Sequence, residues 1–314
     1  MSEIGGYFQL ELPGGKEFHQ PSVRLNSGRN ALEYILIAKK YRKIYLPYYT
    51  CDVLLEPLQK HHITFEFYEV DDKLEPIFDY QKIDDNDAFL FTNYFGLKDN
   101  FVTSLALKVK TLIIDNAQAF YAKPIKDIDT FYSPRKFFGI PDGAYLFTNT
   151  ILFEKFEHDT SYQRFEHLLK RIDISTEDGY ADFTKNDNSL INQPIKLMSP
   201  LTQKLLESIN YMVIAEKRRE NYMYLHEYLK TKNSLWFSEL DGQVPMVYPF
   251  FDKTGILRNK LTANKIYTAL YWQNVISWQP NKHSTEYEFA TNIVHLPIDQ
   301  RYTTKDLDKI LQLI

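Results

Sequence analysis

The feature that most constrains the fold of this chain is the repeated order of short apolar runs and helix-like segments in its first 150 residues. The apolar runs cover 43–49, 63–71, 88–96 and 109–120. Helical patterns cover 26–41 and 51–62, and in the first of these Ala31, Leu32, Ile35 and Leu36 share one face. Strands that alternate with helices predict an α/β domain with a mostly parallel central sheet.

Polar side chains stand where these apolar runs end. They are Thr50, Asn93, Tyr94 and Asp115. Functional groups of such sheets gather at the carboxyl ends of the strands. We therefore expect these four residues at one edge of the sheet.

The later part of the chain predicts a second, smaller unit. We divide the chain into an N-terminal arm (1–20), a large domain (21–200) and a smaller C-terminal α/β domain with a long linking helix (201–314). In the smaller domain we expect strands at 244–251 and 274–278 around a helix at 261–272. Thr304 is expected to cap a last amphipathic helix. The basic run 217–219 is interpreted as a solvated helix face.

Composition excludes several classes of function. The net charge of −4 gives no basic field for nucleic acid or an anionic membrane. Cys51 is the only cysteine, which excludes an intramolecular disulfide and a cysteine-based metal site and is typical of a reducing compartment. Neither a signal peptide nor an apolar run of about 20 residues is present. We expect a soluble cytoplasmic protein with no metal centre, no nucleic-acid partner and no membrane partner.

The motifs of common enzyme classes are missing, which leaves one unusual lysine to explain. The sequence has no phosphate-binding G-x-x-x-x-G-K-[ST] loop, no G-x-G-x-x-G turn, no G-x-S-x-G elbow and no H-E-x-x-H helix. Lys136 stands among aromatic residues in "FYSPRKFFGIPDGA" (131–144), and Asp115 ends the apolar run "LIID". Alone, such a lysine is most often a solvated charge and such an aspartate most often a helix cap.

Together, Lys136 and Asp115 suggest pyridoxal phosphate (PLP) chemistry. A lysine amine forms a Schiff base with the aldehyde of this cofactor, and a carboxylate keeps the pyridine nitrogen protonated. The cofactor also needs a phosphate cup. Ser27, Gly28 and Arg29 open a predicted helix, whose first amides favour an anion.

Six segments, in the same order along the chain, resemble motifs of the DegT/DnrJ family of sugar-nucleotide aminotransferases. They are "SGRNAL", "LPYYT", "TNYFGL", "LIIDNAQAF", "FYSPRKFFGIPDGA" and "HLPIDQRYT". The resemblance is strongest over 110–148 and weak over 150–295. It implies PLP fold type I, the aspartate-aminotransferase-like architecture, and a homodimer with shared active sites.

The resemblance also implies a role for each matching residue. Lys136 would carry the Schiff base and shuttle the proton, and Asp115 would pair with the pyridinium nitrogen. Gln118 would donate a hydrogen bond to the phenolic oxygen of the cofactor. Gly28 and Arg29, with Ser133, would hold the phosphate.

The sequence departs from the family pattern at several of these positions. Arg29 stands where the family has threonine, and an arginine can hold a phosphate through two hydrogen bonds. Cys51 stands where an aromatic residue stacks on the cofactor ring, so Tyr48, Tyr49 or Tyr94 would have to replace it. The Asn-x-Arg-x-Ser segment contributed by the partner subunit is missing, and Lys196 is a candidate replacement.

The predicted function is transfer of an amino group, with L-glutamate as donor, to a keto-sugar that is expected to be nucleotide-linked. The setting implied by the resemblance is surface polysaccharide or amino-sugar synthesis. Two alternatives stay open. One is a PLP enzyme acting on a small keto or amino acid, because the shortening of the chain falls where substrate is held in the family. The other is a catalytically silent PLP-fold binding protein, because the stacking and partner-subunit positions are altered.

Overall fold

An eight-stranded sheet organises the first half of the computed structural model, which describes residues 4–235, 237 and 240–314. The strand order is β1-β8-β7-β6-β5-β2-β3-β4. The strands are β1 (Val23–Leu25), β2 (Lys43–Pro47), β3 (Thr64–Val70), β4 (Pro76–Ile77), β5 (Asp87–Thr92), β6 (Leu112–Asn116), β7 (Asp129–Tyr132) and β8 (Ala144–Phe147). The neighbours from β3 through β2, β5 and β6 to β7 pair in parallel. The predicted α/β class with a mostly parallel sheet is confirmed.

The two ends of the sheet depart from the parallel arrangement. Strand β8 runs antiparallel to both of its neighbours, β1 and β7. At the other end, β4 pairs antiparallel with β3. Because β7 and β8 are antiparallel, the chain turns back between them, and the loop with Lys136 lies in that connection.

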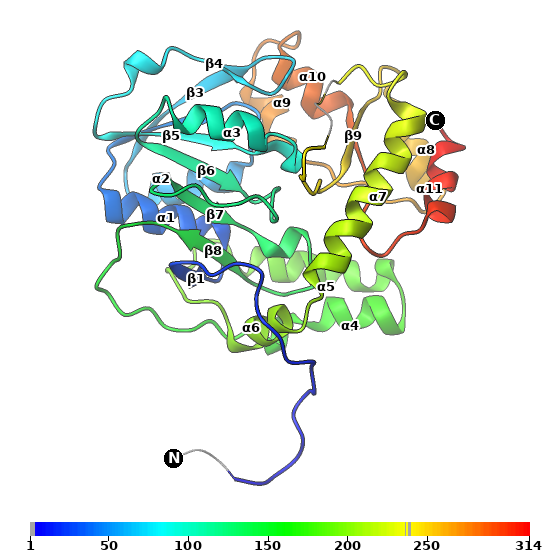
Figure 1. The fold of residues 1–314 in the computed structure, drawn as a ribbon, viewed down its shortest axis with the longest axis horizontal. Coiled ribbons are helices and arrows are strands. Elements are labelled where there is room, and N and C mark those ends of the chain that lie inside the picture. Colours follow the sequence, from blue (N-terminus) through cyan, green and yellow to red (C-terminus); the bar gives the residue numbers. More distant parts are fainter. Residues whose placement is uncertain (1–3, 236, 238–239) are drawn as a thin grey trace.

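Helices pack around the sheet and also make up much of the C-terminal part of the chain (Figure 1). The α-helices are α1 (Gly28–Lys39), α2 (Leu55–Lys60), α3 (Asp99–Ala106), α4 (Glu166–Asp173), α5 (Thr176–Asn188), α6 (Pro200–Glu207), α7 (Tyr211–Leu229), α8 (Leu257–Ala263), α9 (Asn274–Trp278), α10 (Thr285–Asn292) and α11 (Thr304–Leu311). Short 3₁₀ turns are η1 (Asp52–Leu54), η2 (Tyr80–Lys82), η3 (Tyr94–Gly96), η4 (Pro134–Lys136) and η5 (Tyr162–Arg164).

The buried side chains form two clusters, one on each face of the sheet. In β6, Ile113 belongs to one cluster, and Leu112 and Ile114 belong to the other. Successive side chains of a strand point to opposite faces, so the two clusters lie on opposite faces. The cluster with Ile113 also contains the apolar face of α1. The other cluster continues into the C-terminal part of the chain, where it includes Tyr222 and Val294.

The C-terminal part contains a two-stranded antiparallel sheet of β9 (Tyr248–Phe251) and β10 (Ile293–Leu296). The prediction of a strand at 274–278 is wrong, because these residues form α9. The predicted helix at 261–272 is also wrong in extent, since α8 ends at Ala263 and Lys265 and Trp272 have positive φ. The last helix begins as expected, with Thr303 rather than Thr304 as its N-cap.

The expected long linking helix is interrupted. Helix α6 ends at Glu207, and α7 begins at Tyr211 with the Asn210 side chain accepting from the Val213 amide. The backbone of Asn210, the N-cap of α7, is not helical, so α6 and α7 do not form one continuous helix. The boundaries of the three predicted parts of the chain remain a prediction.

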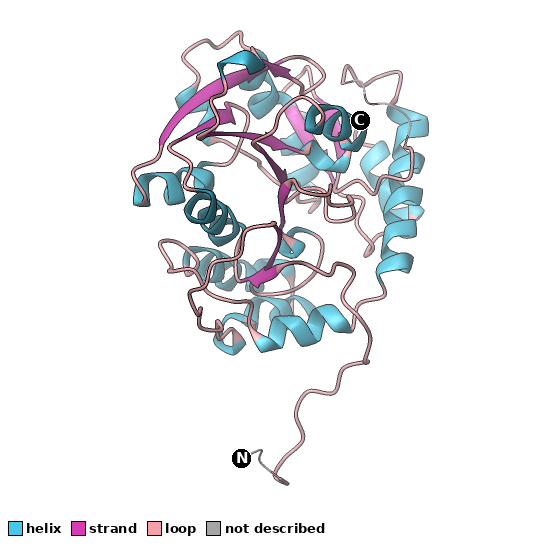
Figure 2. Cartoon of the chain, turned by 60° about the vertical axis from the view of Figure 1, so that its left-hand side comes forward, coloured by secondary structure: helices cyan, strands magenta, loops and turns pink. Residues whose placement is uncertain are grey.

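The N-terminal segment leaves the body of the molecule as an extended chain (Figures 1 and 2). Tyr7 and Phe8 are almost wholly exposed on it. Residues 1–3 of the predicted arm lie outside the described residues. Within the described part of the chain, no helix has the length and apolar character needed to cross a membrane.

Candidate active site

The lysine loop is shaped by a proline at the start of a 3₁₀ turn. Ser133 has extended backbone and Pro134 opens η4, where the fixed φ of proline suits a first helical position. The Lys136 amide donates to the Ser133 carbonyl at 3.2 Å, and the Phe137 amide donates to the Pro134 carbonyl at 2.9 Å. Phe137 is buried while Lys136 is exposed in the single chain. The turn therefore anchors its aromatic neighbour and leaves Lys136 accessible to a ligand.

Asp115 lies on the central strand β6 at the carboxyl edge of the sheet. It pairs with Thr92 of β5 on one side and with Phe131 of β7 on the other. The carboxylate is 7% exposed, and its Oδ1 accepts from the Ala117 amide at 2.8 Å. Burial raises the pKa of Asp115, and the positive charge on Lys136 partly offsets that rise. The structure thus brings the two predicted catalytic groups within electrostatic reach of each other.

Cys51 lies close to the same pair. Burial raises the pKa of its thiol, and the positive charge on Lys136 is the largest opposing influence. Residue 51 therefore borders the lysine site, which is where the family resemblance places the ring-stacking position.

Gln118 is fully buried just after β6, and half of its amide is unpartnered. Its Oε1 accepts from the Phe95 amide at 3.0 Å. Its Nε2 has no hydrogen-bond partner among the described residues, although it is buried. An unsatisfied buried donor costs about 1–3 kcal/mol, so this amide is suited to a ligand that brings an acceptor.

The turn that meets Gln118 has a tight backbone. Phe95 and Gly96 both have positive φ, 59° and 72°. A Cβ at Gly96 would lie 3.1 Å from the Val244 carbonyl oxygen and 3.2 Å from that of Gln118. Glycine is required there because the turn approaches two backbones closely and has a left-handed conformation.

Tyr49 and Tyr94 are buried with their rings packed against each other. The ring centroids are 5.6 Å apart, and the Tyr94 hydroxyl donates to the Tyr49 carbonyl at 2.9 Å. Trp272 packs edge-on against Tyr49 at 4.5 Å, and both tyrosines are fully buried. That either ring stacks on a cofactor stays a prediction. The alternative, Tyr48, is stacked on Phe67 at 4.7 Å.

Three of the predicted phosphate residues, Ser27, Gly28 and Arg29, lie at the start of α1, and the fourth, Ser133, precedes η4. The Ser27 side chain accepts from the Asn30 amide, and Gly28 is the first residue of the helix. Arg29 has an ion pair within the chain, with its Nε 3.4 Å from Glu56 Oε2. Ser133 is half-buried, and its side chain makes no capping bond to η4. Binding of phosphate by these residues stays a prediction.

Lys196 reaches the same helix start from within its own chain. Its carbonyl accepts from the Asn26 amide at 3.0 Å, and its ammonium lies 3.9 Å from Asp159 Oδ1. Asp159 also binds Arg164 at 2.6 Å. The ammonium of Lys196 is thus already near a carboxylate.

Sequence reasoning missed the residues that hold the lysine loop from the C-terminal part of the chain. Arg218 belongs to the run interpreted as a solvated face, yet it is 2% exposed and its guanidinium carbon lies 4.6 Å from the Phe137 ring centroid. Gln300 donates to the Phe137 carbonyl at 3.0 Å. Tyr271 lies beside Lys136 itself. The one hint in the sequence was the aromatic Phe137 after the lysine, because a buried ring needs other side chains packed against it.

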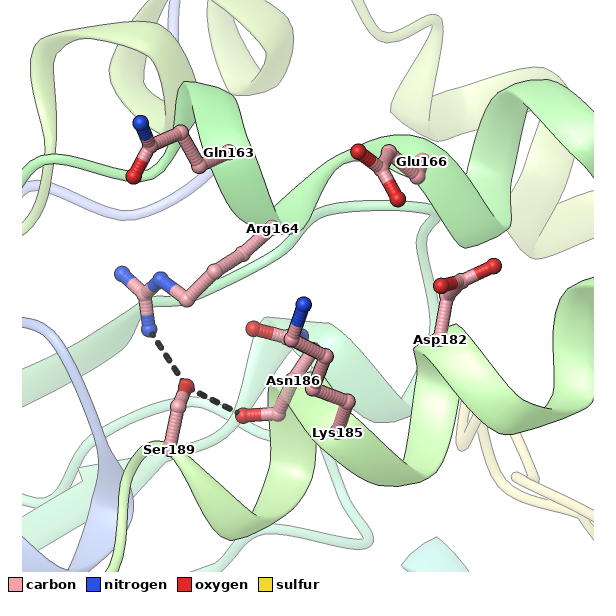
Figure 3. Close-up of a pocket in the computed structure, with 7 residues that line it drawn as sticks. All are labelled: Gln163, Arg164, Glu166, Asp182, Lys185, Asn186 and Ser189. Carbon is pink, nitrogen blue, oxygen red and sulfur yellow. Dashed lines mark hydrogen bonds between the residues drawn. The ribbon is translucent and has the colours of Figure 1, made fainter.

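A separate small cavity lies between η5, α4 and α5 (Figure 3). Arg164 and Ser189 are joined across it by a hydrogen bond of 3.4 Å. Glu166, Asp182 and Lys185 add charges of both signs to its walls. Its mixed charge suits no single ion, and Lys136 and Asp115 are not among its lining residues.

Comparison with solved structures identifies the fold. A DegT DnrJ EryC1 StrS aminotransferase from Brucella abortus aligns with a TM-score of 0.58 at 15% identity, over 93% of this chain and 84% of that one. NtdA from Bacillus subtilis, solved with bound PMP, gives 0.63 at 13% identity, over 93% and 72%. DesV from S. venezuelae gives 0.59 at 16% identity, over 92% and 82%.

No protein-family model and no curated protein matches the sequence. The likeness at these identities is therefore one of fold. The chain has PLP fold type I, the architecture of the sugar aminotransferases, and this confirms the fold that the sequence motifs predict.

Proposed function

We propose that this protein is a PLP-dependent aminotransferase that moves an amino group from L-glutamate to a keto-sugar, expected to be nucleotide-linked. One observation carries the proposal. On a fold shared with sugar aminotransferases, a buried carboxylate at the end of the central strand lies within electrostatic reach of the lysine in the loop beside it. Such a pair suits the two ends of the PLP ring system, the nitrogen and the aldehyde carbon.

The residues present fit this cofactor. The buried Nε2 of Gln118 lacks an acceptor among the described residues, and the phenolic oxygen of PLP would supply one. The acidic oxygens of Asp115 would face the ring nitrogen. When bound, the cofactor supplies an electron-accepting ring conjugated to the reacting carbon.

Each residue of the chain has a distinct task in this proposal. Lys136 Nζ would remove the proton from the α-carbon of the amino donor and deliver it later, as a general base and then a general acid. Asp115 would keep a proton on the ring nitrogen, because its charge favours the cationic ring. The aromatic neighbour Phe137, held by Arg218 and Gln300, would fix the direction from which the amine acts.

The phosphate of the cofactor would bind at the start of α1. The first amides of a helix lack partners within the helix, and Gly28 adds no side chain beside them. Arg29 would add a charge if it exchanges its partner Glu56 for phosphate. Ser133 would contribute a hydroxyl from the lysine loop.

The sugar acceptor and the dimer belong to the same proposal. The similar structures include sugar aminotransferase CalS13 from Micromonospora echinospora, with a TM-score of 0.59 at 12% identity over 93% of this chain and 86% of that one. Lys136 is exposed in the single chain, and a second copy would cover it in a cytoplasmic homodimer. A role in surface polysaccharide or amino-sugar synthesis would follow from the product.

The deciding experiment is the visible absorption spectrum of the purified protein supplied with PLP, before and after addition of L-glutamate. A yellow band that fades with glutamate is the expected result, and it requires both cofactor binding and the first half of the transfer. A band that glutamate leaves unchanged would refute glutamate as donor. A protein without any band would refute the proposal and favour a binding protein.

A panel of acceptors then tests the sugar. Protein loaded with the amino group should transfer it to nucleotide-linked keto-sugars and recover the yellow band. Recovery with small keto acids and with no sugar would favour the alternative enzyme.

A further inference from the structure

Lys136 lies over an aromatic ring that comes from the other end of the chain. Its Nζ is 5.6 Å from the ring centroid of Tyr271. Tyr271 belongs to the segment between α8 and α9, whereas Lys136 belongs to the connection between β7 and β8. A lysine ammonium within about 6 Å of a ring centroid is attracted to the negative face of that ring.

The Tyr271 ring packs against a histidine of the two-stranded sheet. His295 of β10 packs edge-on against it with ring centroids 4.6 Å apart. His295 is itself held by a hydrogen bond of 3.0 Å between its Nδ1 and the Ala269 carbonyl. The Tyr271 ring, which lies near the Lys136 ammonium, is therefore held by packing against β10 of the two-stranded sheet.

Neither ring behind the lysine carries a charge near neutral pH. Burial raises the pKa of Tyr271 to about 12, and the nearby Arg218 opposes the rise. Burial lowers the pKa of His295 to about 3. Tyr271 thus acts on Lys136 through the face of a neutral ring.

We propose that Tyr271 is a positioning residue, which holds the protonated amine of Lys136 against its ring whenever that amine is not bonded to the cofactor. Its meaning for catalysis rests on the function proposed above, while the contact itself does not. The ring stabilises the ammonium and not the free amine. It therefore gives the released lysine amine a defined place at the ring of Tyr271.

Other groups also face the lysine, and they stay constant when Tyr271 is changed. Asp115 approaches from β6 and Cys51 from the start of η1. Arg218 of α7 adds a positive charge near Tyr271. A change that follows substitution of Tyr271 alone can therefore be assigned to the ring.

The test uses the full chain freed of cofactor. Its lysines are labelled with acetic anhydride over a range of pH, and the extent of labelling at Lys136 is read from peptide masses. Tyr271→Leu removes the ring face that holds the unreactive ammonium form. We expect labelling of Lys136, relative to an exposed lysine in the same sample, to rise about two- to fivefold. Tyr271→Phe keeps the face and should match the unaltered protein.

Controls make each outcome decisive. Lys110 is exposed and serves as an internal standard for reagent and fold. If Tyr271→Leu does not fold, Tyr271→Met replaces it, because methionine fills similar space without a ring. Equal labelling of Lys136 in the aliphatic variants and in Tyr271→Phe would overturn the inference. A protein that shows the shift but never binds PLP would refute the proposed function and leave this contact standing.

Discussion

Lys136 is the residue on which the proposed chemistry depends, because the structure places its amine within electrostatic reach of the buried Asp115. Lys136→Ala should lose the yellow PLP band and lower turnover by at least about 100-fold, the usual contribution of a general base. Lys110→Ala, which removes an exposed lysine, should keep both. Turnover that survives in Lys136→Ala would disprove the assignment.

Asp115 should lower the stability of the cofactor-free protein. Its pKa is raised in the folded state, so folding is penalised once pH exceeds the unfolded-state value and the carboxyl must ionise while buried. Asp115→Asn keeps an acceptor for the Ala117 amide but has no charge. At pH 7 without PLP, this variant should be more stable than the unaltered protein in urea unfolding.

The difference between these two proteins should shrink as pH falls toward 4, because Asp115 then becomes protonated and the penalty for burying its charge fades, whereas the Asn variant has no carboxyl to titrate at this position. Bound PLP should reverse the order, since the charged Asp115 would pair with the ring nitrogen. An Asn variant that is less stable at pH 7 without cofactor would contradict this account of Asp115.

At the scale of elements, the turn that follows the lysine loop is fastened to α6 by a buried carboxylate. Asp142 Oδ2 accepts from the Ser199 amide at 2.8 Å, and Oδ1 accepts from the Ser199 hydroxyl at 2.7 Å and from that of Thr202. Ser199 is also the N-cap of α6. One side chain thus fixes both the end of the loop and the start of the helix.

Asp142→Ala should therefore lower the free energy of unfolding by at least about 2 kcal/mol, because it leaves several buried donors unpaired. Urea unfolding monitored by circular dichroism measures it. Asp72→Ala, at an exposed position, is the matched control and should change stability little. A similar small change for both variants would show that the Asp142 contacts contribute nothing.

At the scale of the whole molecule, buried histidines make stability depend on pH. His19 lies among aromatic rings, its Nε2 2.5 Å from the Phe120 carbonyl, and burial lowers its pKa to about 4. The unfolded chain binds a proton at this residue near pH 6.5, and the folded chain does not. Stability therefore falls as pH drops from about 6.5 toward 4.

His19→Phe should remove this part of the pH dependence. Between pH 6 and pH 5 the unaltered protein should lose about 1 kcal/mol more stability than the variant does. His283→Ala, at an exposed histidine, should follow the unaltered protein. Parallel curves for the unaltered protein and His19→Phe would refute the assignment.

Regular local patterns were enough to predict strands β2, β3, β5 and β6 and the motifs that follow them, but not the short strands β1, β4 and β7. Strands β2, β5 and β6 appear as mostly apolar runs, because a strand covered on both faces needs apolar side chains on both. The helix at α1 shows its apolar face and its cap in consecutive residues. Segment 274–278 was mispredicted, since a short apolar run fits a strand or a helix equally well and only its packing selects one.

The sequence by itself determined the α/β class, the strand ends and the order of the motifs that resemble sugar aminotransferases, because these depend on side chains close together in the chain. Only the tertiary structure decided which residues surround the lysine. Arg218, Tyr271 and Gln300 lie more than 80 positions from Lys136 and carry no local signal. Their positions follow from folding the C-terminal part of the chain onto one face of the sheet, and contacts between residues so far apart in the chain are set by packing of the whole molecule.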